Sequence, residues 1–273
     1  MTFKTLLVHA DAGPGCDRRV RLAVRTAAMF DAAVVGLGAE ALSGLFASGD
    51  AMADAVMMEA ARERVAEDLP AAETHFHQLA DGKAAVSWLA DVGYPDAMLS
   101  LHARCADLIV TSRPTKHENA ASAPRIADLV LSAGAPVLVC ADRDAEFSAE
   151  RVVVGWKDTR ESRRALADSL PFLTRAKQVF VVSVSEDPDQ DAPSAALEEV
   201  TARLARHGVN ALAETAPRGH GMVVEALEDA ANRHGADLIV VGAYARSRLQ
   251  EWLLGGVTED LAASSSKFVL FSH

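Results

Sequence analysis

The chain has 273 residues, half of them hydrophobic, and 38 acidic residues against 27 Lys and Arg give it a net charge of -11 at pH 7. This length and composition predict a globular protein with one large domain or two domains of ordinary size. The acidic balance argues against a nucleic-acid-binding surface, because such surfaces need clustered Lys and Arg. The three cysteines show no CxxC spacing, so they indicate neither a zinc site nor a disulfide framework.

The apolar runs of the chain are short. The first run, TLLVHA, reaches Asp11 within a few positions, which is too soon for a signal-peptide core or a membrane span. Longer stretches of the chain are all interrupted by charges. We therefore expect a cytoplasmic protein without a membrane segment.

Strand and helix patterns alternate through the first half of the chain. Continuous apolar runs predict buried parallel strands, and patterns with a period of 3.6 residues predict the helices between them. In chain order, we expect strands at 4–10, 32–38, 72–79, 107–112 and 136–140. The intervening helices are expected at 17–30, 50–69, 96–105 and 122–133.

The second half repeats the first. RCADLIVTSR recurs as HGADLIVVGA, TLLVHAD pairs with RVVVGWKD, AAVVGLGAE with QVFVVSVSED, and APVLVCAD with KFVLFSH. Four matches in one order indicate a duplication. The second-copy strands are expected at 151–156, 178–184, 209–215, 237–242 and 268–272.

Alternating strands and helices predict an α/β fold with two tandem, five-stranded parallel-sheet domains. We expect domains at residues 1–143 and 150–273, joined by the charged segment 142–150 and packed as an intrachain pseudo-dimer. Sheets of this class bind ligands at the carboxyl ends of the strands, where the strand order reverses. The informative residues should therefore follow the first and fourth strands of each copy.

Those residues resemble the universal stress protein (UspA) family in its tandem form. The resemblance rests on the strand-one start with its acidic tip, the repeated ADLIV strand, the glycine-rich turn after it and the APVLV strand that closes the first copy. It covers essentially the whole chain and implies a Rossmann-like sheet of five strands in each domain. It also implies a role in stress response as a sensor or adaptor, and not as an enzyme.

ATP-binding members of that family carry G-x-x-G-(x9)-G-[ST] after strand four, and the second copy keeps this spacing. Ala245 stands at the second glycine and Gly256 at the Ser/Thr position, so a methyl group is added and a hydroxyl donor is lost. The resemblance implies a weakened site for ATP or AMP, with Mg accompanying the nucleotide. Its phosphate side would be formed by Gly242, Ala245, Arg246, Gly255, Gly256, Val257 and Thr258.

The same resemblance implies the other side of the nucleotide site. The family's strand-one Asp meets the ribose; the first copy has Asp11 there, whereas the second copy has Lys157, with Asp158 one residue later. Val184 takes the position whose backbone would meet the adenine. Because the first copy has no glycine between Ser112 and its next helix, we expect nucleotide binding in the second copy alone.

Other interpretations stay open. The chain could be a protein-interaction module that binds no nucleotide or, as a more distant third, a hydrolase-like enzyme, which would need a substrate pocket and an acid–base pair that the sequence does not show. His75 and His77 alternate in the strand expected at 72–79, a geometry that suits two metal ligands, but without a third ligand we expect solvent-facing histidines. The protein partner and further homodimer formation are left open.

Overall fold

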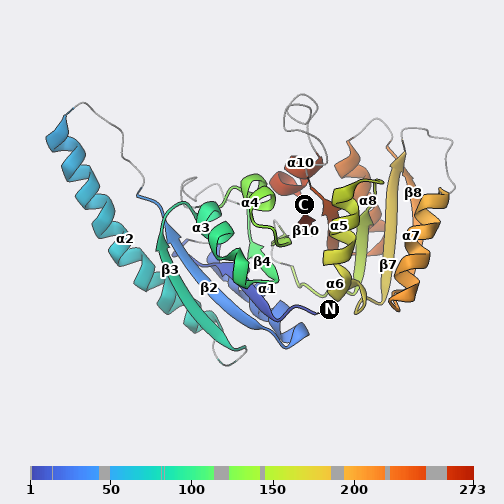
Figure 1. The fold of residues 1–273 in the computed structure, drawn as a ribbon, viewed down its shortest axis with the longest axis horizontal. Coiled ribbons are helices and arrows are strands. Elements are labelled where there is room, and N and C mark those ends of the chain that lie inside the picture. Colours follow the sequence, from blue (N-terminus) through green and yellow to red (C-terminus); the bar gives the residue numbers. More distant parts are fainter. Residues whose placement is uncertain are drawn as a thin grey trace. The chain divides into compact units, whose positions relative to one another are not determined.

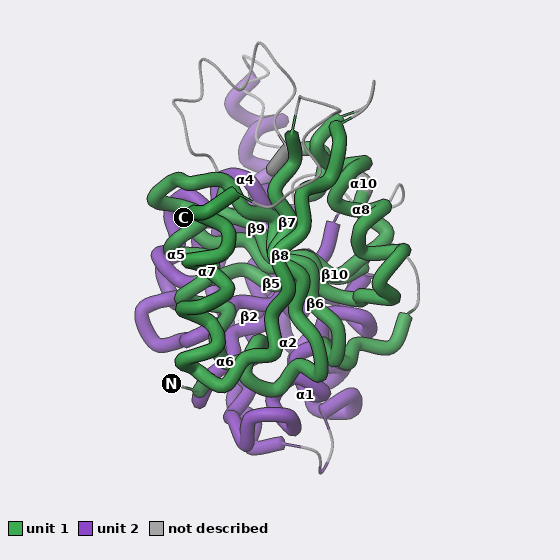
Figure 2. Tube along the Cα trace, turned by 90° about the vertical axis from the view of Figure 1, so that its right-hand side faces the viewer, with its two compact units in different colours: residues 1–2, 136–273 green, residues 3–135 purple. Residues whose placement is uncertain are grey.

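The fold described here is that of a computed structural model of the chain (Figure 1). The structure describes residues 2–13, 15–42, 50–80, 82, 84–113, 123–141, 145–185, 194–218, 222–243 and 257–273, without the side chains of 257–259 and 264. Two compact units divide the chain, drawn in purple and green in Figure 2. The N-terminal unit spans residues 3–135, and the C-terminal unit spans residues 136–273 together with residues 1 and 2.

The N-terminal unit alternates strands and helices as expected. Its strands are β1 (Thr5–His9), β2 (Ala33–Glu40), β3 (Val86–Val92) and β4 (Leu108–Thr111). Its helices are α1 (Cys16–Phe30), α2 (Ala51–Ala80), α3 (Pro95–His102) and α4 (Ile126–Ser132), with a 3₁₀ turn at Ala103–Cys105.

The four strands of this unit form a parallel sheet in the order β3-β2-β1-β4. Leu6 of β1 is paired with Val34 of β2 on one side and with Leu108 of β4 on the other. The chain therefore leaves β1 toward β2 and later returns to the opposite side of β1. Because crossovers between parallel strands are right-handed, helices that follow opposite directions across the sheet cover opposite faces. In agreement, α1 packs with α2, and α3 packs with α4.

The strand expected at 72–79 is wrong, because these residues lie in the last third of α2. Ala72, Phe76 and Ala80 are spaced four residues apart and all three are buried, so the apolar pattern follows one face of a helix. The third strand is β3, a few residues later, where Trp88 packs on Phe76 at a ring-centroid distance of 5.6 Å. The alternating polar and apolar residues His75, Phe76 and His77 resemble a strand pattern, although they lie in this helix.

The C-terminal unit contains the second copy and one additional strand. Its strands are β5 (Val137–Val139), β6 (Arg151–Gly155), β7 (Gln178–Ser185), β8 (Ala211–Pro217), β9 (Leu238–Gly242) and β10 (Phe268–Ser272). Its helices are α5 (Arg160–Asp168), α6 (Leu170–Leu173), α7 (Ala195–Arg206), α8 (Val223–His234) and α10 (Val257–Ser264).

The sheet of the C-terminal unit has the order β5-β10-β9-β6-β7-β8. Its strands are parallel except β5, which is antiparallel to β10 with Val139 paired with Val269. The strand that closes the first repeat therefore joins the strand that closes the second. The α/β fold with tandem, mostly parallel sheets is confirmed.

The aspartate of each ADLIV repeat holds the start of the central strand of its own unit. Asp107 accepts a hydrogen bond from the backbone N–H of Thr5 (2.9 Å), at the first residue of β1. Asp237 accepts one from the backbone N–H of Ser148 (2.6 Å) and a second from the Ser148 hydroxyl (3.0 Å), just before β6. The repeated Asp is thus explained by a structural role that the sequence comparison did not identify.

Candidate functional site

Each sheet has one place where the connections that follow two adjacent central strands run in opposite directions across the sheet. In the N-terminal unit this place lies between the carboxyl ends of β1 and β4, and we call it the N-terminal switch point. In the C-terminal unit it lies between the carboxyl ends of β6 and β9, and we call it the C-terminal switch point. Ligands of open α/β sheets bind at such points, so the two are compared residue by residue.

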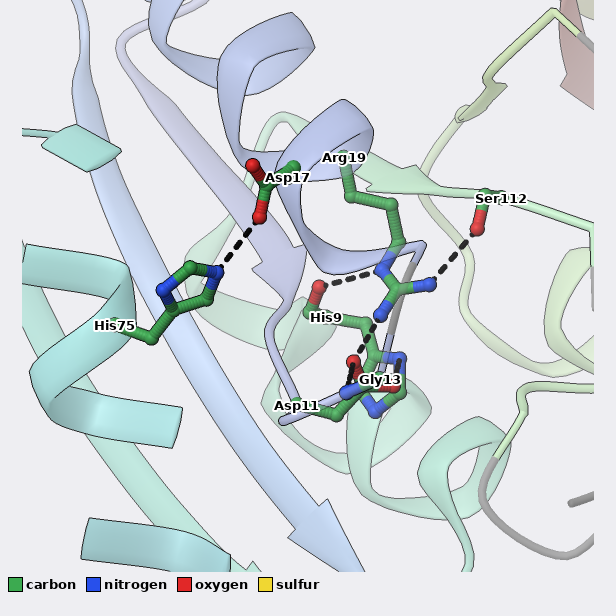
Figure 3. A network of polar contacts seen from close by, with 7 residues as sticks. All are labelled: His9, Asp11, Gly13, Asp17, Arg19, His75 and Ser112. Atoms are coloured by element: carbon green, nitrogen blue, oxygen red, sulfur yellow. Dashed lines mark hydrogen bonds and ion pairs between the residues drawn. The ribbon is translucent and has the colours of Figure 1, made fainter. Parts of the chain in front are cut away.

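One arginine fills the N-terminal switch point (Figure 3). Arg19 extends from α1 and is 1% exposed. Its Nε donates to the backbone carbonyl of His9 (2.9 Å), its Nη1 donates to the hydroxyl of Ser112 (2.8 Å), and its Nη2 donates to Oδ1 of Asp11 (2.5 Å). A single guanidinium therefore ties together the carboxyl ends of both strands from inside the molecule.

Asp11 is committed to these internal contacts. Besides Arg19, it accepts a hydrogen bond from the backbone N–H of Gly13 (3.0 Å), and it is 5% exposed. A carboxylate that is buried and held by an internal ion pair is poorly accessible to a ribose hydroxyl. The side chain that most resembles the family's nucleotide contact thus belongs to the protein core.

His9 lies beneath the same ion pair and is fully buried. Burial, and then the neighbouring charge of Arg19, lower the pKa of His9 to about 4, against the opposing effect of Asp11. The Nδ1 atom of His9 is 3.8 Å from Oδ2 of Asp11. The imidazole is consequently neutral at physiological pH, so Arg19 and Asp11 balance each other without a third charge.

His75 and His77 do not form the metal-ligand pair that a strand would allow. Both lie in α2, where residues two apart point in different directions. His75 Nε2 contacts Oδ1 of Asp17 at 2.7 Å, as Figure 3 shows, whereas His77 Nε2 lies 3.9 Å from Oε1 of Glu73. Within the described residues, no three His, Cys, Asp or Glu side chains are grouped closely enough to hold a metal ion.

The C-terminal switch point has small residues or a lysine where the N-terminal switch point has its polar network. Leu6 pairs with Leu108 in the first copy, and Val152 pairs with Leu238 in the second, so positions in the two copies can be matched by counting from these pairs. The four residues of the network are His9, Asp11, Arg19 and Ser112, and their counterparts are Gly155, Lys157, Ala165 and Gly242. The second copy therefore lacks the side chains that close the first.

Gly242 is required for the packing of α5. A Cβ atom at this position would lie 2.4 Å from the backbone carbonyl carbon of Glu161 and 2.4 Å from the backbone nitrogen of Ser162. No side chain fits at that separation, so the first turn of α5 lies directly against the end of β9. A glycine at this position is explained by packing alone, whether or not a phosphate binds nearby.

The first turn of α5 brings an acidic group to this switch point. Thr159 caps the helix, with its hydroxyl accepting from the backbone N–H of Ser162 (3.3 Å). Burial alone would raise the pKa of Glu161, but hydrogen bonds from its own N–H and the Thr159 hydroxyl, together with Arg160, hold the pKa below its ordinary value. Glu161 is thus ionised in the turn whose backbone lies against Gly242, and its charge opposes the attraction of the helix N-terminus for an anion.

The other residues predicted for the nucleotide site follow β6 and β9 or lie near the end of β7. Lys157 and Asp158 are both exposed after β6, and Asp158 Oδ1 accepts from Nη2 of Arg163 (2.5 Å). Val184 is half-buried near the end of β7. Val257 and Thr258 begin α10, in a stretch whose side chains lie outside the described residues. Ala245, Arg246, Gly255 and Gly256 lie outside the described residues altogether.

Sequence reasoning missed Arg19. The signal was present, because Cys16, Arg19, Val20 and Ala23 have the spacing of the buried face of a helix, and a charged residue on such a face calls for a buried partner. What the pattern could not supply is the identity of that partner, since Ser112 is 93 residues away.

No helix in the described part of the chain is long and apolar enough to cross a membrane.

Comparison with known proteins identifies a family domain in the second half of the chain and solved structures with the same fold. The universal stress protein family model matches residues 148–273. The chain shares its fold with a universal stress protein from Archaeoglobus fulgidus DSM 4304, at 15% identity and a TM-score of 0.70, over 98% of this chain and 95% of that one. A protein from Pseudomonas aeruginosa UCBPP-PA14 assigned to the universal stress proteins has 17% identity and a TM-score of 0.59, over 99% and 93% of the two chains.

No curated protein matches the sequence. Both structural relatives nevertheless cover the N-terminal half as well as the half that the family model matches, which agrees with the internal duplication. Residues 148–273 therefore form a universal stress protein domain, and the chain as a whole shares the fold of universal stress proteins in both of its halves.

Proposed function

We propose that the chain is a cytoplasmic stress-response sensor or adaptor that binds an adenine nucleotide, ATP or AMP, weakly at the C-terminal switch point. The observation that carries this proposal is the contrast between the two copies. The N-terminal switch point is closed by the buried guanidinium of Arg19, whereas its counterpart in the second copy is Ala165. The second copy therefore lacks the side chain that closes the first, at the edge where sheets of this class bind ligands.

Two features of the C-terminal switch point predict low affinity. Lys157 stands where the first copy has Asp11, so a carboxylate acceptor for ribose hydroxyls is missing. Glu161, whose backbone lies against Gly242, adds a carboxylate to the first turn of α5 and, although it is ion-paired with Arg160 (3.1 Å), weakens the attraction of this turn for phosphates. Sequence at the turn agrees, since Ala245 and Gly256 depart from the motif of the ATP-binding members. A weak site suits a protein that responds to large changes in nucleotide concentration.

In this proposal the chain binds nucleotide and does not turn it over. A hydrolase needs a nucleophile or bound water beside a general base. The carboxylates described at the two switch points, Asp11, Asp158 and Glu161, are each engaged in an ion pair with an arginine. Any Mg would accompany the nucleotide's phosphates and not occupy a site of the protein alone.

Isothermal calorimetry of nucleotide-stripped protein with ATP and AMP tests the proposal. We expect micromolar to millimolar binding that is lost in Gly255→Asp, which places a carboxylate in the phosphate turn. Gly208→Asp is the matched control: it adds the same charge at an exposed turn with φ of +76°, where nothing lies within 4 Å of a new Cβ. Retained binding in this control and loss in Gly255→Asp support the site.

A third variant tests the sign of the electrostatics. Glu161→Gln removes a negative charge from the first turn of α5. It should strengthen the binding of ATP more than the binding of AMP, because ATP carries more phosphate charge. Absence of binding at millimolar nucleotide would overturn the proposal and favour an interaction module that needs no nucleotide. Equal binding by wild-type protein and Gly255→Asp would move the site away from the glycine turn.

A further inference from the structure

Three neighbouring strands of the C-terminal sheet end at the same edge. Their order is β6-β9-β10, and β9, in the middle, is parallel to both of the others. The chain leaves β9 through Ala243, the residue after Gly242, and the turn with the glycine spacing starts there. A phosphate bound at this turn therefore has the end of β6 on one side and the end of β10 on the other.

Lys157 lies on the β6 side of Ala243. Gly155, the last residue of β6, is paired with Val241, and Lys157 and Ala243 each follow their member of this pair by two residues. Lys157 is exposed, and none of the described residues forms an ion pair with its ammonium group. It therefore offers an unneutralised positive charge at the level where the turn starts.

His273 lies on the β10 side. The backbone N–H of Ala243 donates to the carbonyl of Ser272, the last residue of β10 (2.8 Å), so the two strands stay paired up to this level. The Nδ1 atom of His273 donates to the backbone carbonyl of Ala243 (2.9 Å). Because a carbonyl oxygen can only accept, Nδ1 carries the proton of the neutral ring, and Nε2 is the atom that takes up a second proton. His273 is exposed, so the cation formed in this way is accessible from solvent.

The carboxylates on the elements around these two residues are already paired. In the segment after β6 and in α5, which packs on β9 and β10, they form the ion pairs Asp158–Arg163 (2.5 Å), Glu161–Arg160 (3.1 Å) and Asp168–Arg164 (2.7 Å). Asp168 also accepts from the hydroxyl of Ser272 (2.6 Å). The two strands beside β10, β5 and β9, contain no titratable residue. Lys157 and a protonated His273 therefore remain as the charges that can attract an anion.

The first copy lacks this arrangement. By the alignment of the two repeats, the counterparts of Lys157, Ala243 and His273 are Asp11, Arg113 and Ala141. Asp11 and Arg113 are each 5% exposed, and Ala141 is 2% exposed. An accessible basic residue on each side of the turn is therefore a property of the second copy.

We propose that Lys157 and His273 bind the phosphate chain of the nucleotide from the two sides of β9, so that the site prefers a triphosphate to a monophosphate and binds it more tightly when His273 is protonated. This inference rests on the proposed nucleotide site at the C-terminal switch point and adds to it the residues that recognise the length of the phosphate chain. Strands β6 and β10 are two strand spacings apart, about 10 Å. Two cations at that separation suit the separate phosphate groups of ATP better than the single phosphate of AMP.

Calorimetry at about pH 6 and about pH 8 tests the contact with His273, because histidine changes its charge between these values. For wild-type protein, ATP should bind about fivefold more tightly at the lower pH, with a smaller change for AMP. His273→Gln should remove this difference, and His273→Lys should bind ATP tightly at both values. Protonation of ATP itself affects every variant equally, so the comparison with His273→Gln isolates the imidazole.

A second variant tests the contact with Lys157. Lys157→Met should weaken ATP binding about fivefold at both pH values, and AMP binding less. The controls change two exposed residues elsewhere: Lys177, which precedes β7 at the opposite edge of the sheet, and His207, which follows α7. Lys177→Met and His207→Gln should bind ATP as the wild type does. Circular dichroism establishes that each variant is folded.

Inorganic tripolyphosphate separates this inference from the proposed function, because it has phosphates but no adenosine. Tripolyphosphate binding that depends on Lys157 and His273, in a protein that does not bind ATP, would support the phosphate contacts and overturn the nucleotide site. ATP binding that is unaffected by Lys157→Met, and that has the same pH dependence in His273→Gln as in wild type, would overturn the inference and leave the nucleotide site standing. Binding of neither ligand would overturn both.

Discussion

Arg19 and Asp11 form an ion pair in the interior of the N-terminal unit, with 2.5 Å between Nη2 and Oδ1 and almost no solvent exposure of either side chain. The pair stands at the position where a sheet of this class would otherwise receive a ligand. The ion pair therefore occupies the N-terminal switch point with buried polar side chains instead of a ligand. Its contribution to the free energy of unfolding can be measured.

Removing one member of this pair should be strongly destabilising. Arg19→Met leaves Asp11 buried without its counter-ion, for which we expect a loss of about 3 to 5 kcal/mol in the free energy of unfolding, measured in urea. The double variant Arg19→Met/Asp11→Leu should recover most of that loss, because no charge remains buried. Arg21→Met is the control: its ion pair with Asp17 is largely exposed, so its effect should stay within about 0.5 kcal/mol. A small loss in Arg19→Met would mean that the ion pair does not hold the switch point together.

The stability of the fold should decrease as the pH falls through the range in which His9 titrates. The unfolded chain takes up a proton on His9 near its ordinary pKa of 6.5, whereas the folded chain resists protonation down to about pH 4. The stabilisation is thus complete above 6.5 and is lost between 6.5 and 4, by on the order of 3 kcal/mol at the lower limit. Urea midpoints measured across this range should change less in His9→Gln than in wild type. The exposed His207→Gln should follow the wild type, and parallel curves for His9→Gln and wild type would contradict the assignment.

Gly242→Ala tests the packing of α5 on β9. Because the new methyl would lie 2.4 Å from backbone atoms of Glu161 and Ser162, the helix has to shift, at an expected cost of about 2 to 3 kcal/mol. Gly208→Ala is the comparison: its φ of +76° costs about 1 kcal/mol, but the position has open space around it. If both variants lose the same amount in thermal unfolding, backbone conformation and not the close contact determines the preference for glycine.

The aspartates of the two repeats should differ in their contribution to stability. Asp237 is half-buried and holds Ser148 through two hydrogen bonds, so Asp237→Ala should cost about 2 kcal/mol, and Asp237→Asn less. Asp107 is exposed, and Asp107→Ala should cost about 1 kcal/mol. Asp229→Ala, at an exposed position of α8, serves as the baseline in denaturant titrations. A loss at Asp107 equal to or greater than that at Asp237 would show that burial is not what separates them.

Most of the fold could be predicted because its signals are local. The central strands of the two sheets are buried on both faces, so the apolar runs around Leu6, Leu108, Val152 and Leu238 are visible without knowledge of their partners. The duplication then identifies the central strands of both copies at once. The same reasoning failed at residues 72–79, since a short stretch such as His-Phe-His fits both an alternating strand and one face of a helix.

The candidate site was less predictable than the fold. Sequence alone determined that the second copy keeps the spacing of a phosphate turn, and that the two copies differ at the ends of their first and fourth strands. Tertiary structure decided what the difference means: Arg19 reaches Ser112 across 93 residues of sequence, and the first turn of α5 leaves Gly242 no room for a side chain. Strand and helix patterns depend on neighbours within a few residues, whereas a buried charge depends on partners that the fold alone brings together.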